Sequence, residues 1–163
     1  MIFNLLDSHD TERLMNRCQD LDIFYQQLAI LFTMPGSPCI YYGTEIALEG
    51  AHDPDCRRCM PWDEIDSAEN QKKIELMKSL IRMRIQEDAC RSLYFDFPHK
   101  YSQKRCVEYR KLNLDGKWIE VLLNCGSEPI EIQGQGEILF ARRCEGNSLD
   151  VRGTLIRRLP STV

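Results

Sequence analysis

The sequence predicts an α/β segment followed by a small all-β domain, and two observations lead to this fold class. Up to about residue 86, short apolar runs alternate with amphipathic segments, which is typical of βα units in a parallel sheet or barrel. From about Leu93 onward, short strand-like runs alternate with turns that contain glycine, as in antiparallel β domains. We therefore expect two domains, residues 1–92 and 93–163.

The first βα unit begins with the apolar run Ile2–Leu6, whose β-branched and aromatic residues predict a buried strand. An amphipathic helix is expected from about Asp20, which can cap the first turn. Its apolar residues recur at spacings of three and four, at Leu21, Phe24, Leu28 and Leu31. The run Met34–Pro38 ends this helix, because its two prolines and its glycine cannot continue it.

The second βα unit starts with the apolar run Cys39–Tyr42, which predicts another strand with both tyrosines in the core. A long loop over residues 44–67 follows. The next helix is expected over Ala68–Gln86, with an apolar stripe of Ile74, Met77, Ile81 and Ile85. A parallel sheet normally has several strands and cover on both faces. Two βα units do not meet this requirement, so we expect them to be the last part of a larger structure.

The β domain is predicted from one hairpin and three further strands. Strand-like runs at residues 105–112 and 117–124 flank an Asp115-Gly116 pair, which is a hairpin signal. Trp118 lies within this hairpin and is expected in the core. Further short strands are expected at residues 129–132, 137–141 and 153–159.

Composition and charge exclude several classes of protein. The hydrophobic fraction of 43% and the charged fraction of 28% are those of a globular domain. A net charge of −4 gives no basic face for nucleic acid. No apolar run approaches the roughly 18 residues that a membrane span requires. The eight cysteines are scattered through a chain with an ample apolar complement, so we expect reduced thiols and a cytoplasmic location.

A polar cluster follows the first predicted strand. His9 and Asp10 come just after its C-terminal end, and in βα barrels the active site is built at that edge. A carboxylate beside an imidazole can stabilise positive charge or bind hydroxyl groups. The alternative is that Asp7, Ser8 and Asp10 only cap the next helix and solvate its loop.

Three motifs in this order resemble the alpha-amylase superfamily. Residues 3–13, FNLLDSHDTER, look like the conserved region that follows its seventh barrel strand, and residues 35–46, PGSPCIYYGTEI, are similar to its eighth strand. Residues 52–63, HDPDCRRCMPWD, resemble the next loop in the neopullulanase, cyclomaltodextrinase and maltogenic amylase branch. The resemblance implies the last two βα units of a (β/α)8 barrel followed by a C-terminal β-sandwich domain. It also implies a retaining α-glucan hydrolase that acts on α-1,4 or α-1,6 bonds of cyclomaltodextrin, pullulan or maltooligosaccharides.

The resemblance also assigns roles to five residues. Asp10 matches the family carboxylate that stabilises the oxocarbenium-like transition state, and His9 matches a histidine that binds the sugar before the cleaved bond. Asp53 and Arg57 fall on the loop that contacts the non-reducing side of the substrate, with Arg58 as an alternative to Arg57. No cofactor is implied. A zinc site needs about four ligands, and the Cys56–Cys59 pair has no second such pair in the sequence, so we expect no metal site.

Two catalytic carboxylates are missing from these motifs. Retaining glycoside hydrolysis needs a nucleophile and a separate acid, and no string here resembles the regions that carry them in the family. We therefore expect this polypeptide to be a C-terminal fragment that is inactive alone. The alternative is a non-catalytic module that binds carbohydrate or a partner protein, which an exposed aromatic pair on the β domain would favour. Unpaired strand edges also predict self-association.

Overall fold

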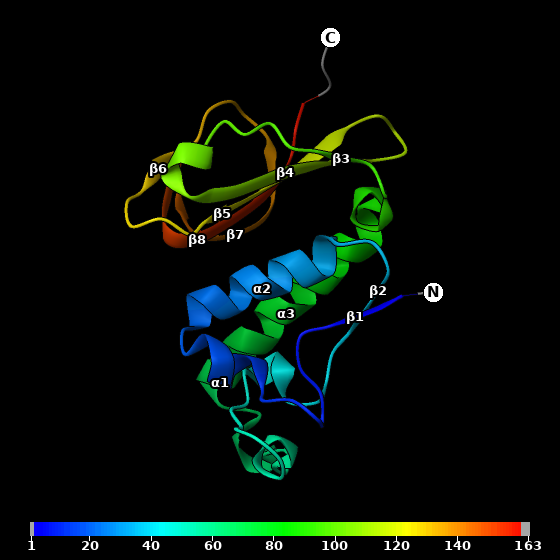
Figure 1. Ribbon diagram of the computed structural model, residues 1–163, viewed down its shortest axis with the longest axis vertical. Coiled ribbons are helices and arrows are strands. Elements are labelled where there is room, and N and C mark those ends of the chain that lie inside the picture. Colours follow the sequence, from blue (N-terminus) through cyan, green and yellow to red (C-terminus); the bar gives the residue numbers. More distant parts are fainter. Residues whose placement is uncertain (1, 161–163) are drawn as a thin grey trace.

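The computed structural model describes residues 2–160. Figure 1 shows helices α2 (Leu21–Thr33) and α3 (Ala68–Gln86) in the middle of the molecule, below a C-terminal sheet. Strands β1 (Phe3–Leu5) and β2 (Ser37–Cys39) and the short helix α1 (Leu14–Cys18) complete the N-terminal part. The predicted order of strand, helix, strand, long loop and helix is confirmed.

Strands β1 and β2 form a parallel pair in which Phe3 lies opposite Ser37 and Leu5 opposite Cys39. The prediction of a buried first strand is wrong for the described residues, because Phe3 is 67% and Leu5 is 50% exposed. The reason is that β1 has β2 as its one strand partner within residues 2–160. The second strand lies earlier than predicted and ends at Cys39, so both tyrosines follow it rather than belong to it.

Helix α2 begins where the sequence predicts. The Asp20 carboxylate accepts hydrogen bonds from the backbone amides of Asp22 (2.9 Å) and Ile23 (3.0 Å), which satisfies two donors that have no partner within the helix. The buried face of α2 includes Phe24, Leu28 and Leu31, as expected from their spacing. The sequence therefore determines both the start and the orientation of this helix.

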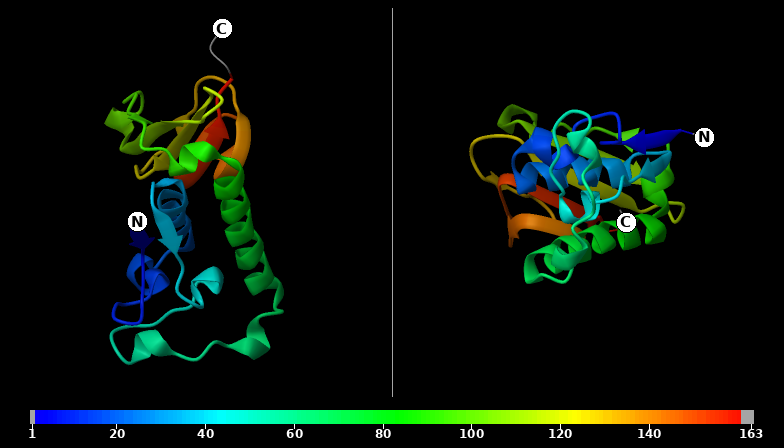
Figure 2. Two further views of the ribbon diagram at one scale, coloured as in Figure 1. Left: turned by 90° about the vertical axis from the view of Figure 1, so that its right-hand side faces the viewer. Right: turned by 90° about the horizontal axis from the view of Figure 1, so that it is seen from below.

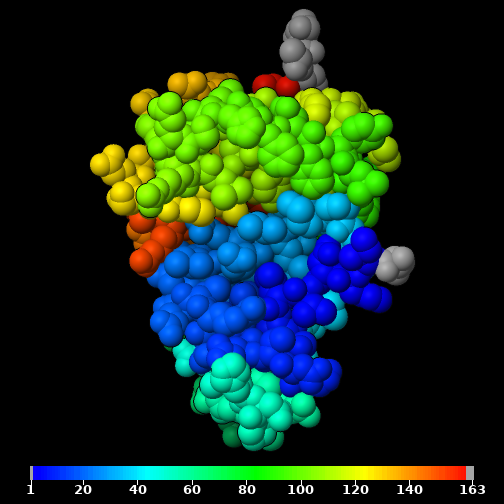
Figure 3. Space-filling model, viewed as in Figure 1, coloured from blue at the N-terminus to red at the C-terminus, as the bar shows by residue number. Residues whose placement is uncertain are grey.

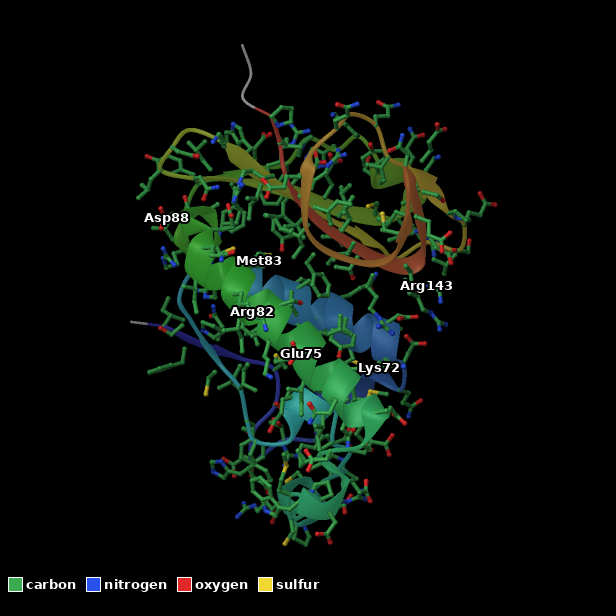
Figure 4. All side chains as sticks on the ribbon, turned by 180° about the vertical axis from the view of Figure 1, so that it is seen from behind. Lys72, Glu75, Arg82, Met83, Asp88 and Arg143 are labelled. Carbon is green, nitrogen blue, oxygen red and sulfur yellow. The ribbon has the colours of Figure 1, made fainter. Side chains whose placement is uncertain are left out.

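Helix α3 has the predicted bounds but only part of the predicted stripe. Met77 is buried, whereas Ile85 is 68% exposed, and the buried face runs instead through Leu80 and Met83. The cause is that α3 packs on α2, on the sheet and on the turn at Thr44–Ile46, and only the side turned toward these elements is buried. Figure 4 shows Lys72, Glu75 and Arg82 along the outer side of α3, where all three are exposed.

Within residues 2–160, no helix is both long and apolar enough to cross a membrane. The loop between β2 and α3 contains three short 3₁₀ turns, at Thr44–Ile46, Asp55–Arg57 and Trp62–Glu64. Figures 2 and 3 show that this loop forms the end of the molecule opposite the sheet.

The C-terminal part is a curled antiparallel sheet of six strands, which agrees with the expected β domain. The strands are β3 (Phe95–Asp96), β4 (Cys106–Leu112), β5 (Trp118–Asn124), β6 (Ile130–Glu131), β7 (Glu137–Glu145) and β8 (Ser148–Arg158). The predicted hairpin is confirmed, since β4 pairs with β5 from Cys106 opposite Asn124 to Leu112 opposite Trp118. Trp118 is half-buried rather than fully in the core.

The long strand β8 causes the curl. Residues 154–158 of β8 pair with β5, and the whole strand pairs on its other side with β7, whose register shifts at two places. The start of β8 pairs with β6. Register shifts of this kind increase twist and bend a sheet. The curl encloses a second apolar core of Tyr101, Cys106, Leu122, Ile130, Ile132, Leu149 and Leu155.

The main apolar core lies between the sheet and the helices, so both parts contribute to it. Buried polar side chains cross the same boundary. The Gln26 amide donates to the carbonyl oxygens of Asn124 (3.0 Å) and Gly153 (3.2 Å). The Lys111 ammonium donates to the carbonyl oxygens of Thr33 (2.7 Å) and Cys90 (3.3 Å), and its burial lowers its pKa to about 8. These hydrogen bonds therefore join the sheet to α2 and to the turn that follows α3.

Candidate functional site

The polar residues singled out in the sequence lie beyond the C-terminal ends of β1 and β2. Asp7 is buried at the base of this region. Its carboxylate accepts a hydrogen bond from the backbone amide of Leu14 (3.0 Å), the first residue of α1, and another from the Thr44 hydroxyl (3.0 Å). Asp7 therefore fixes the loop after β1 to the loop after β2. Asp7 is thus the residue that caps the start of α1, and the Asp10 carboxylate makes different contacts.

His9 and Asp10 lie side by side on the exposed loop between β1 and α1. The His9 Nε2 atom is 3.2 Å from Asp10 Oδ2, and the two side chains are 60% and 69% exposed. On the other side of the carboxylate, Arg57 Nη2 lies 3.4 Å from Asp10 Oδ1. One carboxylate thus lies between an imidazole and a guanidinium at the carboxyl edge of a parallel strand pair, open to a ligand from solvent.

Arg57 connects the two loops of the site. Its Nε atom donates to the carbonyl oxygen of His9 (3.1 Å) and forms an ion pair with Asp53 Oδ1 at 2.7 Å. The sequence separation between Arg57 and His9 is 48 residues, so no local pattern indicates this contact. Four of the five predicted site residues therefore meet around the Arg57 guanidinium.

Arg58, the fifth predicted residue, points elsewhere. Its guanidinium pairs with the Asp55 carboxylate through two hydrogen bonds of 2.6 and 2.8 Å. The hydrogen bond from Arg58 holds the pKa of Asp55 below its usual value, with help from the Ala51 amide. The structure brings Arg57, and not Arg58, to Asp10.

Tyr41 and Tyr42 were expected in the core of a strand, and this prediction is wrong. Tyr42 is 39% exposed, and the two rings instead contact the guanidinium of Arg13, whose Cζ lies 4.1 and 4.5 Å from their centroids. Arg13 itself is fully buried. Sequence reasoning missed this residue, because a charged side chain in a predicted polar loop carries no signal for burial.

Cys56 and Cys59 lie in different environments. Cys56 is buried and its thiol donates to the carbonyl oxygen of His9 (3.2 Å), whereas Cys59 is exposed. In the part of the chain that the structure describes, no three His, Cys, Asp or Glu side chains are grouped as a metal ion would require. Trp62, on the same loop, is 75% exposed and offers a flat apolar face.

The arrangement suits binding and charge stabilisation better than a complete reaction. Asp10 can accept hydrogen bonds from hydroxyl groups and can stabilise a neighbouring positive charge. Retaining hydrolysis of a glycoside requires a nucleophilic carboxylate and a carboxylic acid about 5 Å apart. The two carboxylates at this site, Asp10 and Asp53, both pair with Arg57. They are therefore engaged as acceptors of the same cation.

Comparison with known proteins gives consistent results. A sequence model described as the catalytic domain of alpha amylase matches residues 1–95. The intracellular maltogenic amylase of Bacillus subtilis is 52% identical over 89 residues, which is 54% of this chain. A cyclomaltodextrinase of Thermoanaerobacter pseudethanolicus is 34% identical over 148 residues, or 90% of this chain.

The fold has a counterpart among solved structures. The crystal structure of a maltogenic amylase from S. marinus matches 98% of this chain with a TM-score of 0.75 and 31% identity. The chain spans 23% of that protein, 15% of the B. subtilis relative and 24% of the T. pseudethanolicus relative. It therefore corresponds to less than a quarter of each of these proteins.

Proposed function

This chain belongs to the alpha-amylase family, and on that premise we propose that it is the C-terminal part of a retaining α-glucan hydrolase of the maltogenic amylase, cyclomaltodextrinase and neopullulanase kind. The proposed division is residues 1–92 as part of the catalytic barrel and residues 93–163 as the C-terminal β domain. The observation that carries the proposal is the position of Asp10. It lies at the carboxyl edge of a parallel strand pair, between His9 and Arg57.

In this proposal, Asp10 stabilises the positive charge that develops on the sugar when the glucosidic bond breaks. His9 donates a hydrogen bond to a hydroxyl group of the same glucosyl unit. Arg57 orients Asp10, and Asp53 in turn orients Arg57 through their 2.7 Å ion pair. Arg58 acts on the loop through Asp55 and has no direct role at Asp10.

The proposed substrates are α-glucans with α-1,4 or α-1,6 bonds: maltooligosaccharides, cyclomaltodextrins and pullulan. Their hydroxyl groups match the carboxylate, imidazole and guanidinium donors and acceptors of the site. A cytoplasmic location is proposed as well, because all eight cysteines are unpaired and one relative is named as intracellular.

A crystal structure of the full-length protein with bound maltotriose tests the site. We expect one glucosyl unit with hydroxyl groups within about 3.2 Å of the Asp10 carboxylate and the His9 imidazole. A complex in which the sugar binds only elsewhere would contradict the assignment of these residues.

A binding module is the second candidate function, and one observation favours it. Tyr94 and Phe97, at the start of the β domain, are 72% and 53% exposed. Exposed aromatic rings can stack on sugars or bind a partner protein. Maltotriose bound at Tyr94 and Phe97, with the Asp10 region empty, would support this candidate instead.

Self-association of the 163-residue polypeptide is a further prediction. The open edge of β1 is flanked by exposed Ile2 and Phe3 and by an apolar groove lined by Ile30 of α2 and by Met34, which follows this helix. Unpaired strand edges and apolar grooves recruit other chains. Light scattering at micromolar concentration should therefore give a mass above the 19.1 kDa of one chain. A monomeric mass across the concentration range would contradict the prediction.

A further inference from the structure

Arg13 is a buried charged residue that the proposed mechanism does not use. Its side chain has no exposed surface, although it lies between two loops that reach solvent. Burying a guanidinium is unfavourable unless hydrogen bonds and nearby rings compensate for the lost water. The contacts of Arg13 therefore indicate which parts of the structure it holds together.

These contacts join three segments. The Arg13 Nε atom donates to the carbonyl oxygen of Cys56 (2.7 Å), and Nη1 donates to that of Tyr42 in the loop after β2. The backbone amide of Arg13 donates to the carbonyl oxygen of Gly50 (2.9 Å). A side chain at position 50 would place its Cβ 3.0 Å from Arg13 Cγ, so glycine permits this close approach. Arg13 thus fixes the long loop at two points.

The second of these points adjoins the site. Cys56, whose carbonyl oxygen Arg13 binds, precedes Arg57 in a 3₁₀ turn. From this turn, the Cys56 thiol and Arg57 Nε both donate to the carbonyl oxygen of His9, and Arg57 Nη2 reaches Asp10. The Cys56 carbonyl and the Arg57 side chain therefore belong to the same short turn, and the Arg57 guanidinium is held further by its ion pair with Asp53.

We propose that Arg13 is a positioning residue of the site: by binding the Cys56 carbonyl it holds Arg57 against Asp10. This inference rests on the proposed function for its consequence in glucan binding, but its structural content is independent of that function. A planar guanidinium can lie flat against two tyrosine rings while its Nε and Nη1 atoms donate to two carbonyl oxygens. An ammonium can also donate to two acceptors, but it has no planar face to pack against the rings. Arg13→Lys should therefore lose the positioning although it keeps the charge.

The first test is amide hydrogen exchange in the full-length protein. Arg13→Met and Arg13→Lys should accelerate exchange of residues 51–58 by about tenfold or more, because the turn loses its fixed point. Arg84→Met is the matched control, since Arg84 is also buried and donates to main-chain carbonyls, those of Phe32, Met34 and Cys90. Arg84→Met should destabilise the protein but leave exchange of residues 51–58 unchanged. Unchanged exchange in Arg13→Met, or equal acceleration in Arg84→Met, would overturn the inference.

The second test is a double-mutant cycle on the affinity for maltotriose. Arg13→Met should weaken binding about tenfold in the wild-type background and less than about twofold when Arg57 is already alanine, because Arg13 acts through Arg57. Equal weakening in both backgrounds would overturn the inference. If exchange is accelerated as expected while Asp10→Asn leaves kcat/KM on maltooligosaccharides at the wild-type value, the positioning role is supported and the proposed function is the part that fails.

Discussion

Replacing Asp10 with asparagine is expected to lower kcat/KM of the full-length protein on maltooligosaccharides by about a thousandfold. The amide has nearly the same shape as the carboxylate, so the loop should keep its path. It has no charge, however, and cannot stabilise the positive sugar in the transition state. It also loses the ion pair with Arg57 that orients the group in the structure. The measurement is steady-state kinetics on maltotriose or a longer maltooligosaccharide.

Whether the loss in kcat/KM comes from kcat or from KM shows which role Asp10 has. A transition-state role predicts that most of the loss is in kcat, whereas simple sugar binding predicts a raised KM with unchanged kcat. Asp66→Asn is the matched control. Asp66 is an exposed aspartate near the end of the same long loop, and its replacement should change kcat/KM by less than about twofold. An Asp10→Asn enzyme with wild-type kcat would remove Asp10 from the catalytic mechanism.

Local features of this fold could be predicted from the sequence. The Asp20 side chain caps α2 by accepting hydrogen bonds from the amides two and three residues ahead. A contact between residues so close in the sequence can be predicted from the local pattern of residue types. The β4–β5 hairpin follows from the turn residues between two strand-like runs in the same way. His9 and Asp10 could be singled out because they directly follow a predicted strand.

The features that could not be predicted depend on contacts between residues far apart in the sequence. Arg57 reaches Asp10 across 47 residues, and Gln26 reaches Asn124 across 98. The burial of Arg13 arises only when the long loop, at Tyr42, Gly50 and Cys56, folds around its side chain. Ile85 fits the helical spacing of apolar residues but lies exposed. The spacing identifies the apolar face of a helix, but it does not show which other elements pack against that face. Exposed Phe3 has the same explanation, since a strand is buried only where other elements pack on it.

A single comparison tests the central claim most directly: the hydrolysis of cyclomaltodextrin and maltotriose by the full-length protein and by residues 1–163 alone. If this chain carries only the transition-state carboxylate of a retaining hydrolase, the full-length protein should release reducing sugar. Residues 1–163 should then release none above the enzyme-free control, because hydrolysis requires a nucleophile and an acid and we propose that both lie outside these residues.

Two results would contradict this account. Hydrolysis by residues 1–163 alone would mean that the nucleophile and the acid lie within this chain. A full-length protein that hydrolyses neither these glucans nor pullulan would remove the enzyme function and leave sugar or partner binding as the better explanation of the site.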